Sequence, residues 1–213
     1  MLPRPRTTDI TGLILAGGRA TRMQRREKGL QQLDGISLVE RVITRLLPQV
    51  GTIAINANSN LDAYQRFGFP VWSDHGADES APIAYNGPLD GVATGLRHCS
   101  TPYLLVVPCD CPFLPQDLAD RLMTALDDDH ADIAVATSGI AAEPRMQPTF
   151  CLMRVTVLPQ LQDYLRNGGR RMDGWYGSAK VVHARFADEA QFINLNTLED
   201  LERHTVMLRN TQN

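Results

Sequence analysis

A short apolar run that ends at two adjacent glycines constrains the fold of this chain more than any other feature. Ile10–Leu15 is rich in branched apolar residues, which is typical of a strand buried on both faces of a parallel sheet. Gly17 and Gly18 follow it, and glycine permits positive φ and a close approach of backbone N–H groups to a phosphate or a base edge. The segment therefore predicts a buried strand that opens into a nucleotide-binding loop.

The residues after these glycines concentrate positive charge. Residues 19–28 hold five cations against a single acid, Glu27, in a chain whose formal net charge is -3. This local excess predicts that the loop neutralises a polyanion. The alternative is a solvated basic face on an ordinary strand-end turn, which the two glycines alone would favour. The five cations are Arg19, Arg22, Arg25, Arg26 and Lys28.

Spacing separates this loop from two better-known phosphate loops. It has neither Gly-x-x-x-x-Gly-Lys-Ser/Thr nor Gly-x-Gly-x-x-Gly, so a P-loop GTPase and a dinucleotide dehydrogenase fit poorly. It has Leu15-Ala16-Gly17-Gly18, then Arg22-Met23, then Lys28-Gly29-Leu30. This pattern resembles the nucleotidyltransferases that move a nucleoside monophosphate onto a phosphorylated acceptor, and most of all the molybdenum cofactor guanylyltransferases. Gln24–Glu27 departs from the glycine that this family usually has after the methionine.

Composition fits one soluble enzyme domain. A chain of 213 residues with 43% hydrophobic content can bury a substantial core, so we expect a single domain over residues 1–213, with its core at about 10–205. No apolar run approaches about 18 residues, and the N-terminal one is too short for a signal peptide, so we expect a cytoplasmic protein without a membrane partner. The four cysteines form no disulfide framework and no Cys-x-x-Cys pair. Nearly balanced charge disfavours binding to nucleic acid.

Strand and helix patterns alternate along the chain. This alternation predicts an α/β fold with a Rossmann-like, mostly parallel sheet and helices on both faces, which the resemblance narrows to the nucleotide-diphospho-sugar transferase type. Ligands of such sheets bind beyond the carboxyl ends of the strands. After the first strand we expect strands at 52–57, 71–73, 103–108, 133–137, 149–153 and 180–186, and helices at 38–47, 61–67, 89–98, 115–126, 155–166 and 198–208.

Asp110 is the best candidate for a metal ligand. It follows the most apolar expected strand, and Mg²⁺ prefers carboxylate and phosphate oxygens while keeping several waters. The pattern alone equally allows Asp110 to cap the helix expected from Pro115. The resemblance favours the metal role, for Mg²⁺ with Mn²⁺ as a substitute, and makes Lys28, Arg22 and Asp110 the catalytic residues.

Other strand ends carry residues that the resemblance assigns to the nucleotide. Asn56 and Asp74 each end an expected strand, although an aspartate there is also a common turn residue, and Asn58 could simply bridge loop backbone. Gly87–Gly91 matches the Gly-Pro-Leu-x-Gly element on the guanine side. The stretch 75–85 is longer than expected for the family and could form a lid. The expected nucleotide-binding residues are Leu15, Ala16, Gly17, Gly18, Lys28, Asn56, Asp74, Gly87, Gly91 and Asp110.

The resemblance also indicates where the acceptor binds. Arg170 and Arg171 resemble an arginine pair near the acceptor, although a solvated surface pair is an equal alternative. Asn194 and Asn196 belong to an Asn-x-Asn-Thr element at the pterin site, which we expect at the opposite end of the sheet's carboxyl edge from the nucleotide. The threonine of this element, Thr197, is also a good N-cap for the last helix, with Asp200 at the third helical position, and both interpretations can hold.

The implied reaction is transfer of GMP from GTP to the terminal phosphate of molybdopterin, with release of pyrophosphate. No Ser-His-Asp, Cys-His or paired-carboxylate set offers a nucleophile, so the acceptor phosphate must attack. Further implied partners are upstream molybdenum-insertion proteins and downstream molybdoenzymes or chaperones. One alternative is another NTP transferase, cytidylyl or sugar-phosphate guanylyl, although by resemblance Gly17-Gly18 in place of Ala-Ala-Gly favours GTP. The other is a non-catalytic nucleotide-binding or cofactor-handling protein, which the presence of Lys28 and Asp110 disfavours.

Overall fold

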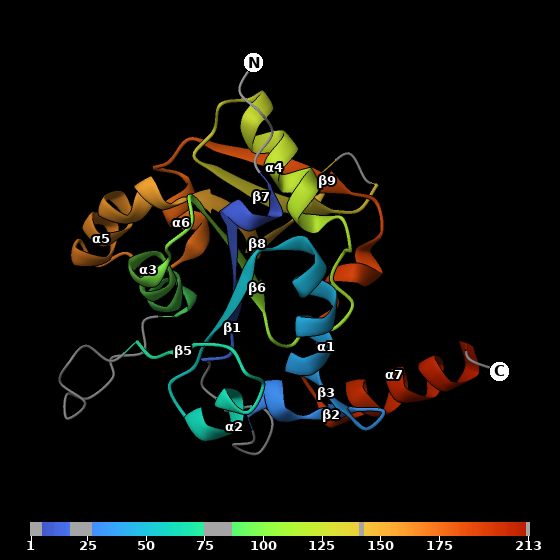
Figure 1. The fold of residues 1–213 in the computed structure, drawn as a ribbon. Coiled ribbons are helices and arrows are strands. Elements are labelled where there is room, and N and C mark those ends of the chain that lie inside the picture. Colours follow the sequence, from blue (N-terminus) through green and yellow to red (C-terminus); the bar gives the residue numbers. More distant parts are fainter. Residues whose placement is uncertain (1–5, 18–26, 75–86, 141–142, 212–213) are drawn as a thin grey trace.

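A seven-stranded sheet runs through the molecule with helices on both of its faces (Figure 1). The structure, a computed structural model, describes residues 6–17, 27–74, 87–140 and 143–211. The strand order is β5-β4-β1-β6-β8-β7-β9, and each neighbouring pair is parallel except the two pairs that include β8. This arrangement confirms the predicted fold class.

Most predicted elements are present near their expected positions. The strands of the large sheet are β1 (Ile10–Leu15), β4 (Thr52–Asn56), β5 (Val71–Trp72), β6 (Tyr103–Pro108), β7 (Ile133–Ser138), β8 (Arg145–Arg154) and β9 (Val181–Phe186). The helices are α1 (Leu38–Leu46), α2 (Leu61–Gln65), α3 (Pro88–His98), α4 (Leu118–Asp128), α5 (Leu158–Arg166), α6 (Met172–Tyr176) and α7 (Leu198–Thr211).

A small hairpin and the short helix α6 were not predicted. The hairpin pairs β2 (Gln32–Leu33) with β3 (Ile36–Ser37). Its turn residues Asp34 and Gly35 have φ values of 52° and 78°, and Asp-Gly is a favoured pair for a two-residue hairpin turn with positive φ at both positions. The Asp-Gly pair was therefore a usable signal, but two-residue strands are too short to show an alternating pattern.

The start of α4 differs from the prediction. We expected Pro115 in its first turn, but the helix begins at Leu118. Gln49 explains the shift, because its Nε2 donates to the Pro115 carbonyl at 2.9 Å and its Oε1 accepts the Ala119 N–H at 3.0 Å. A side chain 70 residues away in sequence thus satisfies the helix N-terminus.

The sheet separates two apolar layers. In β1, Ile14 belongs to the layer that contains α1 and α4, whereas Leu13 and Leu15 belong to the layer that contains α3, α5 and α6. The two groups of helices lie on opposite sides of the sheet in Figure 1. Burial of β1 on both faces confirms the interpretation of its continuous apolar run.

The parallel strands β4, β1 and β6 end at one edge of the sheet. Leu15 at the end of β1 is in register with Asn56 of β4 and Pro108 of β6, and Asn56 is in register with Trp72 of β5. The polar residues that follow these strands are therefore neighbours in space.

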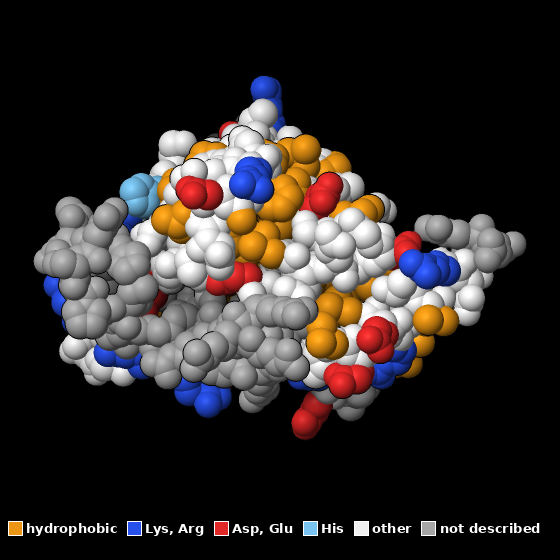
Figure 2. Space-filling model, turned by 90° about the horizontal axis from the view of Figure 1, so that it is seen from below, with side chains coloured by type: hydrophobic (Ala, Val, Ile, Leu, Met, Phe, Trp, Pro, Cys, Tyr) orange, Lys and Arg blue, Asp and Glu red, His pale blue; other side chains and the backbone are white. Residues whose placement is uncertain are grey.

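On the face seen in Figure 2, acidic and basic side chains of the described residues are interspersed. Within the described ranges, no helix is both long and apolar enough to span a bilayer.

Candidate active site

The site centres on an ion pair between two loops at this edge. Lys28 begins a 3-10 turn, η2 (Lys28–Leu30), and Asp110 follows β6. The Lys28 Nζ lies 3.4 Å from the Asp110 Oδ2, and the two side chains are 27% and 11% exposed. Partial burial reduces screening by water, so this pair interacts more strongly than a fully exposed pair would.

The turn that carries Lys28 packs closely against the body of the molecule. Gly29 is buried, and a Cβ at this position would lie 2.9 Å from the Tyr64 hydroxyl and 3.3 Å from the Cys109 Sγ. The Gln31 Nε2 also donates to the Glu27 carbonyl at 3.1 Å across the turn. The Lys-Gly pair of the motif therefore has a steric reason: glycine lets the backbone come close enough to direct Lys28 toward Asp110.

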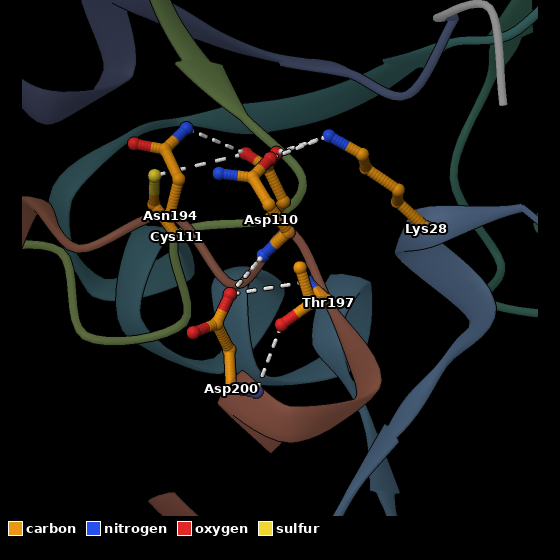
Figure 3. Close-up of polar contacts among 7 residues, drawn as sticks. Lys28, Asp110, Cys111, Asn194, Thr197 and Asp200 are labelled. Carbon is orange, nitrogen blue, oxygen red and sulfur yellow. Dashed lines mark hydrogen bonds and ion pairs between the residues drawn. The ribbon is translucent and has the colours of Figure 1, made fainter. Parts of the chain in front are cut away.

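Two asparagines from the segment before α7 complete the cluster (Figure 3). The Asn194 Nδ2 donates to the Asp110 Oδ1 at 3.1 Å, and the Lys28 Nζ donates to the Asn196 Oδ1 at 2.6 Å. These asparagines, which we expected at the opposite end of the sheet's carboxyl edge from the nucleotide, thus adjoin two residues that were also expected to contact the nucleotide. The separation of the two ligands stays a prediction. The Leu195 N–H donates to the Asp110 carbonyl at 2.9 Å, and this backbone bond brings the C-terminal segment to the end of β6.

The structure excludes one of the two interpretations of Asp110, the helix cap. Its carboxylate does not cap α4, because both of its oxygens contact other segments and Gln49 serves the start of that helix. Cys111 also lies beside this carboxylate, with its Sγ 3.7 Å from the Asp110 Oδ1. Burial, followed by the neighbouring negative charge of Asp110, raises the pKa of the Cys111 thiol, which keeps it a protonated donor.

The donor chemistry around Asp110 suits a divalent cation. The Asp110 carboxylate oxygens and the amide oxygen of Asn196, which accepts the Lys28 Nζ, are hard ligands of the kind that Mg²⁺ prefers. Among the described residues, no group of three or more His, Cys, Asp or Glu side chains is arranged to hold a metal. A cation at Asp110 would therefore need further oxygens from water or from phosphates, which is how Mg²⁺ binds in nucleotide sites.

Asp74 lies in a second polar cluster, at the ends of β4 and β5. The Asn56 Nδ2 donates to the Asp74 Oδ1 and the Asn58 Nδ2 donates to the Asp74 Oδ2, both at 2.7 Å. The Asn58 Oδ1 accepts the Asp74 N–H at 2.8 Å. Asn58 therefore bridges loop backbone, as considered from sequence, and in addition orients the carboxylate, which was not predicted.

Glycines let neighbouring backbone approach this second cluster. A Cβ on Gly91 of α3 would lie only 2.4 Å from the Asn56 Oδ1, and one on Gly17 would lie 3.2 Å from the Asn58 Nδ2. Gly87, before α3, has a φ of 98°, which favours glycine. The structure thus brings Gly17, Gly91 and Asn56 together. Of the remaining predicted features, Gly18, Arg22 and the stretch 75–86 lie outside the described residues.

The two arginines proposed for the acceptor lie on the surface. Arg171 forms a 2.7 Å ion pair with Asp173, and the Arg170 Nη1 donates to the Leu165 and Gly169 carbonyls at 2.9 and 2.6 Å. In the part of the chain that the structure describes, no hydrogen bond or ion pair joins either arginine to Lys28 or Asp110. Their role in acceptor binding stays a prediction.

Known proteins match this chain over most of its length. The MobA-like NTP transferase domain matches residues 12–180. A molybdenum cofactor guanylyltransferase of Bordetella petrii is 47% identical, over 92% of this chain and 97% of its own length. One of Acidovorax ebreus is 48% identical, over 92% of this chain and 94% of its own length. The chain belongs to the molybdenum cofactor guanylyltransferase family.

A solved structure with a related name has the same fold as this chain. The crystal structure of molybdopterin-guanine dinucleotide biosynthesis protein A from Archaeoglobus fulgidus superposes with a TM-score of 0.72 at 19% identity, and covers 94% of this chain and 99% of that one. Family membership confirms that the protein is an enzyme, a nucleotidyltransferase, and disfavours the non-catalytic alternative. NTP transferases generally need a divalent cation, which agrees with the oxygen donors around Asp110.

Several functional contacts of this guanylyltransferase were missed from sequence. The contact between Asn196 and Lys28 joins residues 168 positions apart, and no local pattern reveals it. Asp200 was noticed only as a partner of Thr197 at the helix start, yet it also binds the Asn196 backbone at 3.1 Å. The Asn-x-Asn spacing of Asn56 and Asn58 could have indicated their shared partner Asp74, because alternate residues at the end of a strand point to the same side.

Proposed function

We propose that this guanylyltransferase transfers GMP from GTP to the terminal phosphate of molybdopterin at the cluster formed by Lys28, Asp110, Asn194 and Asn196. The observation that carries the proposal is the 3.4 Å pair of Lys28 and Asp110 at the carboxyl edge of the sheet, with an asparagine amide on each member. This edge is where parallel α/β sheets bind ligands.

The chain's residues supply position and charge rather than a nucleophile. The acceptor phosphate is already anionic, so it needs no strong base to attack the α-phosphorus of GTP in line, and the bond to pyrophosphate breaks as the new bond forms. During the reaction, negative charge shifts from the attacking oxygen to the leaving oxygen, and the Lys28 ammonium offsets this charge on the phosphates. Asp110 would hold a divalent cation, Mg²⁺ or in its place Mn²⁺, which when bound neutralises phosphate charge.

The second cluster would bind the nucleoside part of GTP. The backbone of Leu15, Ala16 and Gly17 would run along the nucleotide, with Asn56 and Asp74 beside it. The two amide donors that hold Asp74 leave its carboxylate oriented, and a carboxylate is a good acceptor for the ring N–H and amino groups of guanine. Gly87 and Gly91 would let the start of α3 come near the base.

The acceptor would approach from the side of the α7 segment. Asn194 and Asn196 would then contact both the catalytic pair and the pterin phosphate. Arg170 and Arg171 would reach the acceptor from the side of α3 instead, because the Arg170 carbonyl lies 3.4 Å from the Cβ position of Gly87. Gly18 and Arg22 belong to the same proposal through the family motif. A molybdenum-insertion protein as donor of the acceptor, and a molybdoenzyme or its chaperone as recipient of the product, are proposed as protein partners.

The experiment is incubation of the purified protein with molybdopterin, Mg²⁺ and each NTP in turn, followed by mass analysis. We expect one product, heavier than the acceptor by GMP, and only with GTP. Lys28→Ala should lower turnover about 100-fold at saturating GTP. Arg166→Ala removes an exposed cation that pairs with Asp163 on α5, and should leave turnover unchanged. A product formed with CTP, or normal turnover of Lys28→Ala, would contradict the proposal.

A further inference from the structure

A carboxylate outside the proposed site holds the segment that carries Asn196. The Asp200 Oδ2 accepts the N–H groups of both Asn196 and Thr197 at 3.1 Å (Figure 3). The Asp200 N–H in turn donates to the Thr197 Oγ1 at 3.0 Å. The two bonds with Thr197 form the capping box of α7. The bond with Asn196 goes beyond a helix cap, because Asn196 precedes the cap residue.

Asp200 is suited to hold a backbone segment. Burial raises the pKa of the Asp200 carboxyl. The hydrogen bonds from Thr197 and from the N–H groups of Asn196 and Thr197 lower it, and the net result is a pKa below the usual value. Its other oxygen, Oδ1, lies 2.6 Å from the Arg203 Nη2 on the next turn of α7. One oxygen thus faces the helix surface and the other faces the segment before the helix.

Asn196 connects Asp200 to the catalytic pair. Its N–H is held by Asp200, and its side-chain Oδ1 accepts the Lys28 Nζ at 2.6 Å. A lysine ammonium sits on a flexible four-carbon stem, so its position depends on its acceptors. Here those acceptors are the Asn196 Oδ1 and the Asp110 Oδ2. Any shift of the Asn196 backbone therefore moves one of the two groups that locate the Lys28 charge.

We propose that Asp200 is a positioning residue for guanylyl transfer, which acts through the Asn196 backbone to locate the Lys28 ammonium beside Asp110. This inference rests on the proposed function of the site. Stabilisation of a transition state by a charge requires that the charge be in place beforehand. A displacement of about 1 Å can cost as much as 100-fold in rate, so the effect on kcat should be large although Asp200 contacts neither substrate.

The test compares Asp200→Ala with Arg203→Ala. Both variants lose the ion pair between Asp200 and Arg203, and Asp200→Ala, which also weakens the capping box, should melt a few degrees lower than wild type. Only Asp200→Ala frees the Asn196 N–H, and we expect it to lower kcat about tenfold with less than a twofold change in the KM for GTP. Arg203→Ala should keep the wild-type kcat. Equal losses in the two variants, or a normal kcat in Asp200→Ala, would overturn the proposal.

Further variants test whether Asp200 acts through the Asn196 backbone. Asp200→Asn keeps an oxygen that can accept both N–H groups, and should return kcat to within threefold of wild type; a variant as slow as Asp200→Ala would overturn the positional argument. Adding Asp200→Ala to Asn196→Ala should lower kcat by less than twofold, and a further tenfold loss would show another route. Asp200→Ser, whose shorter side chain cannot reach the Asn196 N–H, replaces Asp200→Ala if that variant does not fold.

A measurement without turnover separates this inference from the proposed function. The chain has only two lysines, Lys28 and Lys180, so ¹⁵N-lysine labelling yields two ammonium signals to assign. In the ligand-free protein, Asp200→Ala should shift the Lys28 signal and leave that of the exposed Lys180 unchanged, and Arg203→Ala should shift neither. An unchanged Lys28 signal in Asp200→Ala overturns the positioning role. A wild-type protein that makes no product contradicts only the proposed function.

Discussion

Asp110 illustrates how contacts with distant residues define a functional side chain. It lies 82 residues from Lys28 and 84 from Asn194 along the chain, and both contact its carboxylate. Its immediate neighbour Cys111 adds a thiol at 3.7 Å. The helix that it was equally able to cap on sequence grounds is served by Gln49 instead. At the scale of the residue, charge is therefore what Asp110 provides, and helix capping is not.

Asp110→Asn tests this distinction. Asparagine keeps the size of the side chain but removes the charge that a hard cation requires. We expect a folded protein with a similar Tm and a GMP transfer rate lower by about 100-fold or more, partly recovered at high Mg²⁺ or Mn²⁺. Calorimetry should show weaker GTP binding in the presence of the cation and little change in its absence. Full activity at limiting Mg²⁺ would exclude Asp110 as the ligand and make Asp74 the next residue to test.

At the scale of the element, α3 depends on two glycines for its approach to the sheet. A Cβ on Gly91 would lie 2.4 Å from the Asn56 Oδ1, whereas a Cβ on Gly95 would lie 2.5 Å from the Leu13 Cδ2. Both positions face the sheet, but only Gly91 lies against a residue of the proposed nucleotide site. One turn of the same helix thus packs on the polar edge and the next packs on the apolar core.

Gly91→Ala and Gly95→Ala form a matched pair. Each adds one methyl group to a tight contact, and overpacking costs about 1–3 kcal/mol, offset in part by the better helix propensity of alanine. We expect both variants to lose stability in urea unfolding. Only Gly91→Ala should also weaken GTP binding, because Asn56 must move and Asp74 loses a donor. Equal GTP affinity in the two variants would show that α3 serves the fold alone.

At the scale of the whole molecule, both apolar layers enclose cysteine thiols. Cys109 and Cys111 lie in the layer of α1 and α4, and Cys151 lies in the layer of α3, α5 and α6. Burial raises the pKa of all three thiols, in the case of Cys151 to about 12. Only global unfolding exposes the three together, so their ionisation reports on the stability of the entire fold.

Stability should therefore fall as the solution becomes alkaline. Because the folded-state pKa values lie above the unfolded value of about 8.5, this contribution is fully present below about pH 8.5 and is lost as the pH rises further. Between pH 7.5 and 9.5 we expect the free energy of unfolding to drop by about 1 kcal/mol for each buried thiol. Urea titrations at several pH values measure this decrease in the free energy of unfolding. Cys151→Ala should make the decrease smaller by the contribution of one thiol. A stability independent of pH over this range would contradict the prediction.

Features that depend on near neighbours could be predicted from the sequence alone. The apolar run of β1 and the glycines after it define a buried strand and a close turn, since both patterns act within a few residues. The capping box of Thr197 and Asp200 spans three positions, and the structure contains it. The alternation of strands and helices likewise predicts a parallel sheet, because a crossover helix must cover one of its faces.

Only the tertiary structure decided how distant segments meet. The place of β8 between β6 and β7, antiparallel to both, depends on how the chain returns to the sheet rather than on the residues of the strand. The same is true of Asn196, which joins Lys28 across 168 residues. An asparagine amide bonds equally well to many partners, so its residue type does not specify which one it finds. The packing of α7 and of the segment before it makes that choice, and with it the geometry of the catalytic pair.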